Sequence, residues 1–286
     1  MPVTDPHEYL ALLVLWSTFS IFAAVSNAFL LTVTLLTKGK EANAVLVNLE
    51  AIFTITSASG SLLVWTGHAL DKEPPFGLCL VNASISMANV PLQGASALAI
   101  ALSVWVSVTE IYCSPRTVTA MRRVTWAPFL LALPYVTGLP LFFAGLYVRI
   151  MDKSLIYRGS PFYCVVDYPP LQTAASALGA ITTFLSIVFS FWTTGNLVTT
   201  RWRVRRFTDY PGIAYPFVIR TLLFAVFVAV AFVVGIVSLQ RGYSDIVPDV
   251  VLSTCGVAVF IIFSTSKVCA CLSLQFCAAC SEFYST

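Results

Sequence analysis

The sequence predicts an all-α membrane protein: a bundle of seven transmembrane helices, with the N-terminus outside the cell and the C-terminus in the cytosol. Composition is the first indication, because hydrophobic residues make up 58% of the 286 residues, charged residues make up 10%, and the mean hydropathy is +0.86. A soluble domain needs about 25% charged residues to cover its surface. The other two indications are a succession of long apolar segments and an uneven distribution of basic residues.

Each apolar segment is long enough to cross a bilayer, which takes about 20 residues of helix. Helix is expected because an open strand edge in lipid leaves backbone groups without hydrogen bonds, and the alternation typical of a transmembrane barrel is missing. The chain therefore forms one seven-transmembrane domain over residues 1–286, ending in a cysteine-rich cytosolic tail at 268–286. The expected helices lie near residues 9–37, 44–70, 78–110, 124–147, 170–200, 216–240 and 249–267.

The first apolar segment resembles a secretory signal in its position but not in its composition. A signal peptide begins with a positively charged region and has a short apolar core. Here Asp5, His7 and Glu8 precede the segment, which is long enough to span a bilayer. We therefore expect a retained helix.

Basic residues fix the expected orientation. Cytosolic connections of membrane proteins carry an excess of Lys and Arg. With the N-terminus outside, 11 of the 16 basic residues lie on the cytosolic side, namely Lys38, Lys40, Arg116, Arg122, Arg123, Arg201, Arg203, Arg205, Arg206, Arg220 and Lys267. The opposite orientation would reverse this excess, so the sequence predicts an outer N-terminus and a cytosolic C-terminus.

Two cysteines are expected on the outer side. Cys79 lies where the first outer connection enters the third helix, and Cys164 lies in the longest outer connection, between the fourth and fifth helices. Disulfides persist in the oxidising environment outside the cell. A bridge between them would hold the long connection over the mouth of the bundle. Two free thiols are the alternative, because sequence alone does not give the distance between them.

Four further cysteines follow the seventh helix on the cytosolic side: Cys269, Cys271, Cys277 and Cys280. Juxtamembrane cysteines are candidates for S-palmitoylation. Two close pairs can also bind zinc, but this segment is apolar and has no histidine or acidic residue suited to support a metal. Palmitoylation, zinc binding and ordinary buried thiols remain as alternatives.

Ionisable side chains at membrane depth are costly and are candidates for function. Glu50 in the second helix is the clearest, with Asn27 and Asn48 as possible partners. A neutral, hydrogen-bonded structural carboxyl is the alternative interpretation. Glu110 and Arg220, near the cytosolic ends of the third and sixth helices, could form an inter-helix lock, or each could extend to the interface by itself.

A polar face in the outer half of the third helix is the candidate ligand site. Ser86, Asn89 and Gln93 have the spacing of residues on one helical face. Pro91 is expected to bend this helix, and the fourth helix contains Pro134 and Pro140. Such residues often line a cavity, although small and polar residues also hold membrane helices together.

The basic run after the fifth helix contains Arg201, Arg203, Arg205 and Arg206. It can attract anionic lipid of the inner leaflet, face an acidic partner protein, or serve only to orient the chain. A separate segment, Asn82-Ala83-Ser84, matches the glycosylation acceptor pattern. That match is weak, because a glycosylating enzyme has poor access to the start of a helix.

The seven helices, the outer N-terminus, the Cys79/Cys164 placement and the cysteine-rich tail resemble those of G-protein-coupled receptors. The segments Pro74-Pro75-Phe76-Gly77-Leu78-Cys79, Phe162-Tyr163-Cys164 and Arg201-Trp202-Arg203 are similar to stretches of the orphan seven-helix receptors of mushroom-forming fungi. The resemblance covers nearly the whole chain. The acidic-Arg-aromatic motif of the rhodopsin-like class is absent after Glu110, the sixth helix has no internal proline, and the seventh lacks Asn-Pro-x-x-Tyr.

The resemblance implies a plasma-membrane receptor that binds an extracellular ligand and signals to a heterotrimeric G protein. Its expected partners are membrane lipid, the G protein and the ligand, with no nucleic acid and no cofactor. The surface expected to face the G protein includes Glu110, Arg122, Arg123, Arg201, Arg203, Arg205, Arg206 and Arg220. No catalytic constellation is evident, so an enzyme is not expected. The alternative function is a small seven-helix transporter or channel.

Overall fold

The structure, a computed structural model, describes residues 6–38, 44–71, 73–112, 126–159, 162–204, 215–241 and 249–264. Within these residues the fold is helical apart from one small antiparallel β-hairpin. The helices are α1 (Pro6–Lys38), α2 (Ala44–Gly60), α3 (Leu62–Trp65), α4 (Phe76–Tyr112), α6 (Trp126–Met151), α7 (Pro169–Val204), α8 (Tyr215–Arg241) and a C-terminal helix (Asp249–Ser264). A 3₁₀ turn, η2 (Lys153–Leu155), precedes strands β1 (Ile156–Tyr157) and β2 (Val165–Val166).

Four of these helices are long and apolar enough to cross a membrane: Leu10–Leu36, Phe76–Val106, Pro128–Val148 and Pro169–Asn196. Three shorter apolar helices accompany them, at Ala44–Gly60, Ile219–Val234 and Asp249–Ser264. The prediction of an all-helical chain with apolar helices suited to a membrane is therefore confirmed within the described residues.

Large apolar side chains project outward from the bundle. Phe29 on α1, Phe143 on α6 and Phe184 on α7 are 58%, 60% and 55% exposed. A soluble monomer rarely presents extended apolar surface to water, whereas lipid tails solvate such side chains at no cost. Besides apolar residues, the buried positions include many polar side chains, for example Ser20 and Ser84. Buried polar side chains of this kind are typical of packing between membrane helices.

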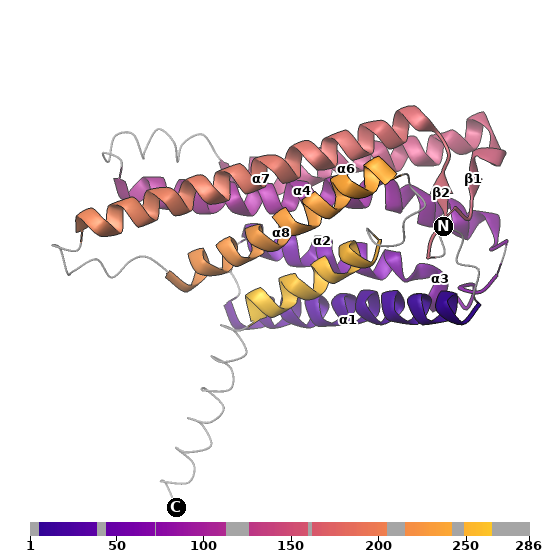
Figure 1. The fold of residues 1–286 in the computed structure, drawn as a ribbon, viewed down its shortest axis with the longest axis horizontal. Helices are drawn as coiled ribbons and strands as arrows, with labels where there is room; N and C mark the ends of the chain where they lie inside the picture. Colours follow the sequence, from indigo (N-terminus) through magenta and orange to yellow (C-terminus); the bar gives the residue numbers. More distant parts are fainter. Residues whose placement is uncertain are drawn as a thin grey trace, which may run out of the picture.

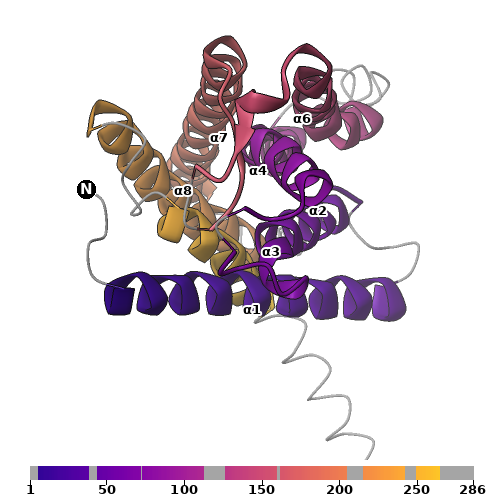
Figure 2. The ribbon, with the colours of Figure 1, turned by 90° about the vertical axis from the view of Figure 1, so that its right-hand side faces the viewer.

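Successive long helices run back and forth along the bundle, so that the β-hairpin and the start of α4 lie at one end and the end of α7 lies at the other (Figure 1). Viewed from the hairpin end, α4 lies between α2, α6 and α7, and α1 crosses the others obliquely (Figure 2). We call the end that carries β1 and β2 the hairpin end. The central position of α4 makes it the common wall of the sites described below.

The helix expected over residues 44–70 is interrupted. α2 ends at Gly60, and the short helix α3 ends just before Gly67, which has a φ of 76°. The backbone N–H of Gly67 donates to the carbonyl of Val64 at 3.1 Å, and that of His68 donates to the carbonyl of Leu63 at 2.9 Å. This paired bonding with a left-handed glycine is the Schellman ending of a helix, so Gly67 is the sequence signal for the earlier end.

Glycines let α4 approach its neighbours closely. A Cβ on Gly138 of α6 would lie 2.3 Å from Cγ of Leu92, and one on Gly179 of α7 would lie 2.5 Å from Cγ1 of Val90. Such separations are shorter than any tolerated contact, so a side chain at either position would push the helices apart. Close backbone approach through small residues is typical of membrane helix packing, and here it sets the width of the bundle around α4.

Candidate functional site

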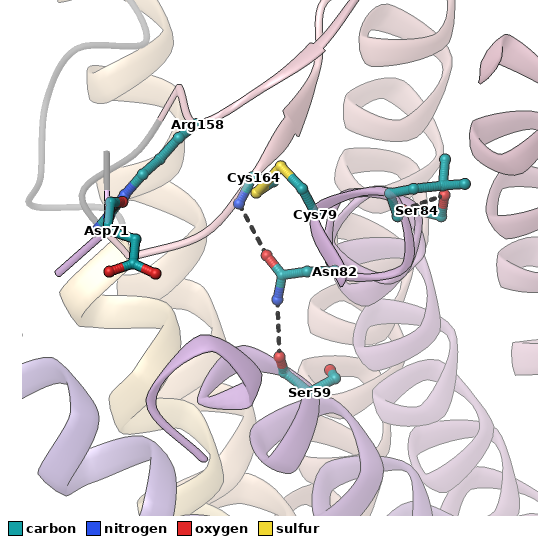
Figure 3. The surroundings of a disulfide bond; sticks show 8 residues. Ser59, Asp71, Cys79, Asn82, Ser84, Arg158 and Cys164 are labelled. Carbon is teal, nitrogen blue, oxygen red and sulfur yellow. Dashed lines mark hydrogen bonds between the residues drawn. A yellow bond between two sulfur atoms is a disulfide. The ribbon is translucent and has the colours of Figure 1, made fainter. Parts of the chain in front are cut away.

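The hairpin covers one end of the bundle and is tied to α4 by a disulfide. Strand β1 pairs with β2 in antiparallel register, with Ile156 opposite Val166. Cys164, which directly precedes β2, is bonded to Cys79 in the first turn of α4, with an S–S distance of 2.04 Å and a Cα–Cα distance of 5.3 Å (Figure 3). The two cysteines expected to meet outside the membrane therefore lie at bonding distance.

Asn82 joins three elements beneath the disulfide (Figure 3). Its Nδ2 donates to the carbonyl of Ser59 in α2 at 3.1 Å, and its Oδ1 accepts from the backbone N–H of Cys164 at 2.8 Å. The side chain is 1% exposed. In the sequence, Asn82 matches only the glycosylation acceptor pattern, and its position one turn after Cys79 is the signal for a structural role.

Two further contacts hold the hairpin to the bundle. The guanidinium of Arg158 donates to the backbone carbonyls of Asp71 and of Ala69, the latter at 2.6 Å. The rings of Trp16 on α1 and Phe162 stack with centroids 4.8 Å apart, and both side chains are buried. The hairpin is thus attached to α1, α4 and the segment that follows α3.

The base of the hairpin carries one perturbed carboxyl. The backbone N–H of Ser154 donates to Oδ1 of Asp152 at 2.8 Å. This hydrogen bond, reinforced by the Ser154 side chain, lowers the pKa of Asp152 below its ordinary value. Because the side chain is fully exposed, it serves as a local turn contact.

Below the hairpin lies a cavity of about 100 Å³ with a mixed lining, which we call the polar chamber. The three residues of the predicted ligand site, Ser86, Asn89 and Gln93, all lie on its wall. Val90 of α4 lies beside them. Further walls come from α1, α2, the hairpin connection and the C-terminal helix: Trp16, Ser20, Thr56, Ser57, Gly60, Tyr163, Asp249, Leu252 and Ser253. The phenol of Tyr163 donates to Oδ1 of Asp249 at 2.7 Å, which links the hairpin to the C-terminal helix across this chamber.

Deeper between α4, α7, α8 and the C-terminal helix lies a cavity of about 200 Å³, which we call the apolar chamber. Its lining is mostly hydrocarbon and includes Phe53, Ala97, Phe224, Val228, Ala231, Phe232, Leu252 and Cys255. Sequence reasoning did not identify this chamber, because its walls come from helices distant in the sequence. Ordinary apolar residues of a membrane helix carry no signal that they face a cavity.

Three residues, Val90, Gln93 and Leu252, line both chambers. One N–H of Gln93 Nε2 donates to Oγ1 of Thr56 at 3.0 Å, and the carbonyl oxygen of Gln93 can accept from a ligand at this boundary. One turn toward the hairpin, Oδ1 of Asn89 is buried and lacks a hydrogen-bond partner. A buried acceptor left unpaired costs about 1–3 kcal/mol, so a donor delivered to this position would relieve that cost.

The buried carboxyl of Glu50 lies elsewhere, on α2. It is fully buried and accepts a hydrogen bond from Oγ1 of Thr34 on α1 at 3.1 Å. Neither asparagine considered as a partner bonds to it: Nδ2 of Asn27 donates to the carbonyl of Gly256 at 2.8 Å, and Nδ2 of Asn48 donates to the carbonyl of Leu131 at 3.2 Å. The sequence gives no signal for the Thr34–Glu50 contact, because the rotation of α1 against α2 is decided by packing.

Asn27 is a second buried polar group that connects helices. It is fully buried, and its Nδ2 bonds link α1 to the C-terminal helix, while its Oδ1 has no partner. Asn48 accepts in turn from the hydroxyl of Tyr135 on α6 at 2.6 Å. These amides act between helices, as polar groups in membrane bundles commonly do.

Most of the expected cytosolic surface lies beyond what the structure describes. Arg122, Arg123, Arg205 and Arg206, and the tail cysteines Cys269, Cys271, Cys277 and Cys280, lie outside the described residues. Glu110 is near the end of α4 and Arg201 and Arg203 are near the end of α7, where only the backbone is described. Arg220 is half-buried on α8. The expected Glu110–Arg220 lock therefore stays a prediction.

Comparison with known proteins adds no family: no protein-family model matches the sequence, and a search of curated proteins returns no match. Within the described residues, no group of three or more His, Cys, Asp or Glu side chains is arranged to hold a metal ion. Two adjoining chambers beneath a disulfide-tied hairpin can enclose a small molecule. Function is therefore inferred from this arrangement.

Proposed function

We propose that this chain is a receptor of the G-protein-coupled type in the plasma membrane, which binds an extracellular ligand in the two chambers and signals to a heterotrimeric G protein. The observation that carries the proposal is the position of the chambers. The polar chamber lies among α1, α2, α4 and the C-terminal helix, and the apolar chamber lies among α2, α4, α7, α8 and the C-terminal helix, under a hairpin tied to α4 by the Cys79–Cys164 disulfide. A pocket enclosed by several helices lets a ligand favour one helix arrangement over another.

Seven crossings and an outer N-terminus are part of this proposal. Four helices have the length and apolarity to span a membrane, and three shorter apolar helices pack with them. The disulfide supports an outer location for the hairpin end, because such bonds persist in oxidising compartments. The helical backbone around Arg201 and Arg203 lies at the opposite end, where the positive-inside rule favours the cytosol (Figure 1).

Epitope tags test the topology directly. A tag at the N-terminus should be labelled on intact cells, and a tag at the C-terminus should be labelled only after permeabilisation. Labelling of both tags on intact cells would contradict seven crossings.

Nucleotide exchange tests the coupling. Purified receptor in nanodiscs, mixed with each G-protein subtype and with ligand pools, should accelerate nucleotide exchange. Changing Arg201 and Arg203 to Ala should reduce that exchange, because both lie toward the proposed cytosolic surface. The matched control Arg149→Ala, in the last turn of α6 at the hairpin end, should leave exchange unchanged.

A receptor that binds ligand but activates no subtype would count against the proposal. Flux measurements in vesicles distinguish the alternative of a small transporter or channel. Substrate uptake by purified protein, without any G protein, would replace the receptor function.

A further inference from the structure

The two chambers differ in chemistry, and this difference specifies the class of ligand. The apolar chamber is enclosed largely by hydrocarbon side chains such as Phe53, Phe224 and Val228. The polar chamber presents amide, hydroxyl and carboxylate groups, including Asn89 and Asp249. The chambers meet at Gln93. A single occupant that satisfies both must be apolar at one end and polar at the other.

The volumes of the two chambers indicate the size of the ligand that fits within them. An apolar cavity of about 150 Å³ holds a benzene molecule, so the apolar chamber, at about 200 Å³, accommodates roughly six to ten carbon atoms. The polar chamber, at about 100 Å³, has room for a small head group. A longer ligand, such as a peptide or a complete phospholipid, would extend beyond the two chambers.

The polar groups limit the chemistry of the head. Nε2 of Gln93 is already donating to Thr56, and the atom of Asn89 that lacks a partner is the acceptor Oδ1. Tyr163 donates its hydroxyl hydrogen to Asp249. A ligand head that donates a hydrogen bond therefore complements the unpartnered Oδ1 of Asn89 and the carbonyl oxygen of Gln93.

We propose, building on the receptor function above, that the ligand is a small amphipathic molecule with a hydrogen-bond-donating head. Its apolar body occupies the apolar chamber, and its hydroxyl or ammonium group lies at Gln93 and Asn89. A hydroxyl head can bind through these two acceptors alone. An ammonium head gains additional attraction from the Asp249 carboxylate.

Binding of simple probes to the purified full chain in nanodiscs tests the head group, with empty nanodiscs correcting for partition into lipid. The probes are 1-octanol, octylamine and hexyl ethyl ether, which has as many heavy atoms as 1-octanol but no donor. We expect 1-octanol to bind roughly three- to tenfold more tightly than the ether, as one net hydrogen bond implies. Asn89→Leu should reduce this preference, because it removes one of the two acceptors, and Asp249→Asn should weaken the binding of octylamine alone. Equal binding of alcohol and ether to the unmodified chain would overturn the proposal.

A second measurement tests the location of the body. Ala231→Leu fills part of the apolar chamber and should weaken the binding of 1-octanol and of the ether by the same factor. Ala229→Leu, on the same helix but outside the chamber wall, is the matched control and should leave both unchanged. A diazirine-bearing octanol should label residues of α8 and the C-terminal helix near Val228 and Leu252. Labelling confined to lipid-facing residues such as Phe184 would show that the probe only partitions into the surrounding lipid, and this would overturn the proposal.

The two proposals fail separately, because these binding measurements contain no G protein. Probe binding with the expected pattern, combined with no nucleotide exchange by any subtype, removes the receptor function and leaves the ligand class standing. Exchange driven only by ligands that lack an apolar body removes the ligand class and leaves the receptor function standing.

Discussion

The backbone N–H of Cys164 donates a hydrogen bond to the side-chain Oδ1 of Asn82 at 2.8 Å, so the hairpin is held to α4 by a polar contact as well as by the disulfide. The same amide reaches α2 through the carbonyl of Ser59. One side chain thereby joins α2 and α4 to the hairpin (Figure 3). The shape of the proposed ligand site depends on these contacts.

Replacing Asn82 with Leu should destabilise the fold. The change leaves the Cys164 N–H and the Ser59 carbonyl without their partner in a buried site, and each unpaired group costs roughly 1–3 kcal/mol. Thermal unfolding of the purified variant should show a clear fall in the midpoint. Val81→Leu, at a neighbouring position that is 41% exposed, is the control. An unchanged midpoint for Asn82→Leu would show that the bridge contributes nothing.

Replacing either cysteine of the disulfide should have the same effect as replacing the other. Cys79→Ser, Cys164→Ser and the double variant should lower surface expression equally, because each removes the same bond. Loss of a native disulfide typically costs about 2–5 kcal/mol, and the two cysteines are 85 residues apart in sequence. Cys255→Ala, which removes a thiol outside any disulfide, should retain expression. Unequal effects of the two single variants would indicate separate roles.

The stacked rings of Trp16 and Phe162 should be energetically coupled. Trp16→Leu and Phe162→Leu each remove a buried aromatic ring, and a double-mutant cycle isolates their mutual contribution. We expect a coupling of about 0.5–1.5 kcal/mol beyond the loss of buried area, measured by chemical or thermal unfolding. Because Trp16 lines the polar chamber, both variants should also weaken 1-octanol binding. Strict additivity in stability would mean that the stack contributes no specific energy.

Adding a methyl group at Gly138 should separate α4 from α6. The new Cβ would lie 2.3 Å from Cγ of Leu92, and overpacking of this kind typically costs about 1–3 kcal/mol. Leu92→Ala in the same chain should restore part of the lost stability by removing the clash. The control Gly195→Ala has no atom within 4 Å of the new Cβ and should be neutral or slightly stabilising. Thermal unfolding of the three variants distinguishes steric overlap from a general intolerance of alanine.

The sequence by itself determined that this protein is suited to a lipid environment and which of its segments form apolar helices. Apolar segments of membrane-spanning length predict helices because lipid offers no hydrogen bonds to an open backbone, and helices appear in all seven expected places within the described residues. Periodicity also placed Ser86, Asn89 and Gln93 on one face of α4, and all three line the polar chamber. These features depend on local composition and spacing, which a sequence displays directly.

The tertiary structure alone decided which distant residues meet. The apolar chamber, the pairing of Thr34 with Glu50 and the bridge through Asn82 all require the relative rotation and spacing of separate helices. Those quantities come from the summed packing of many side chains, including the close approach of α4 at Gly138 and Gly179, and no single segment encodes them. The chain's helices can therefore be read from its sequence, whereas the cavity between them is a property of how they pack.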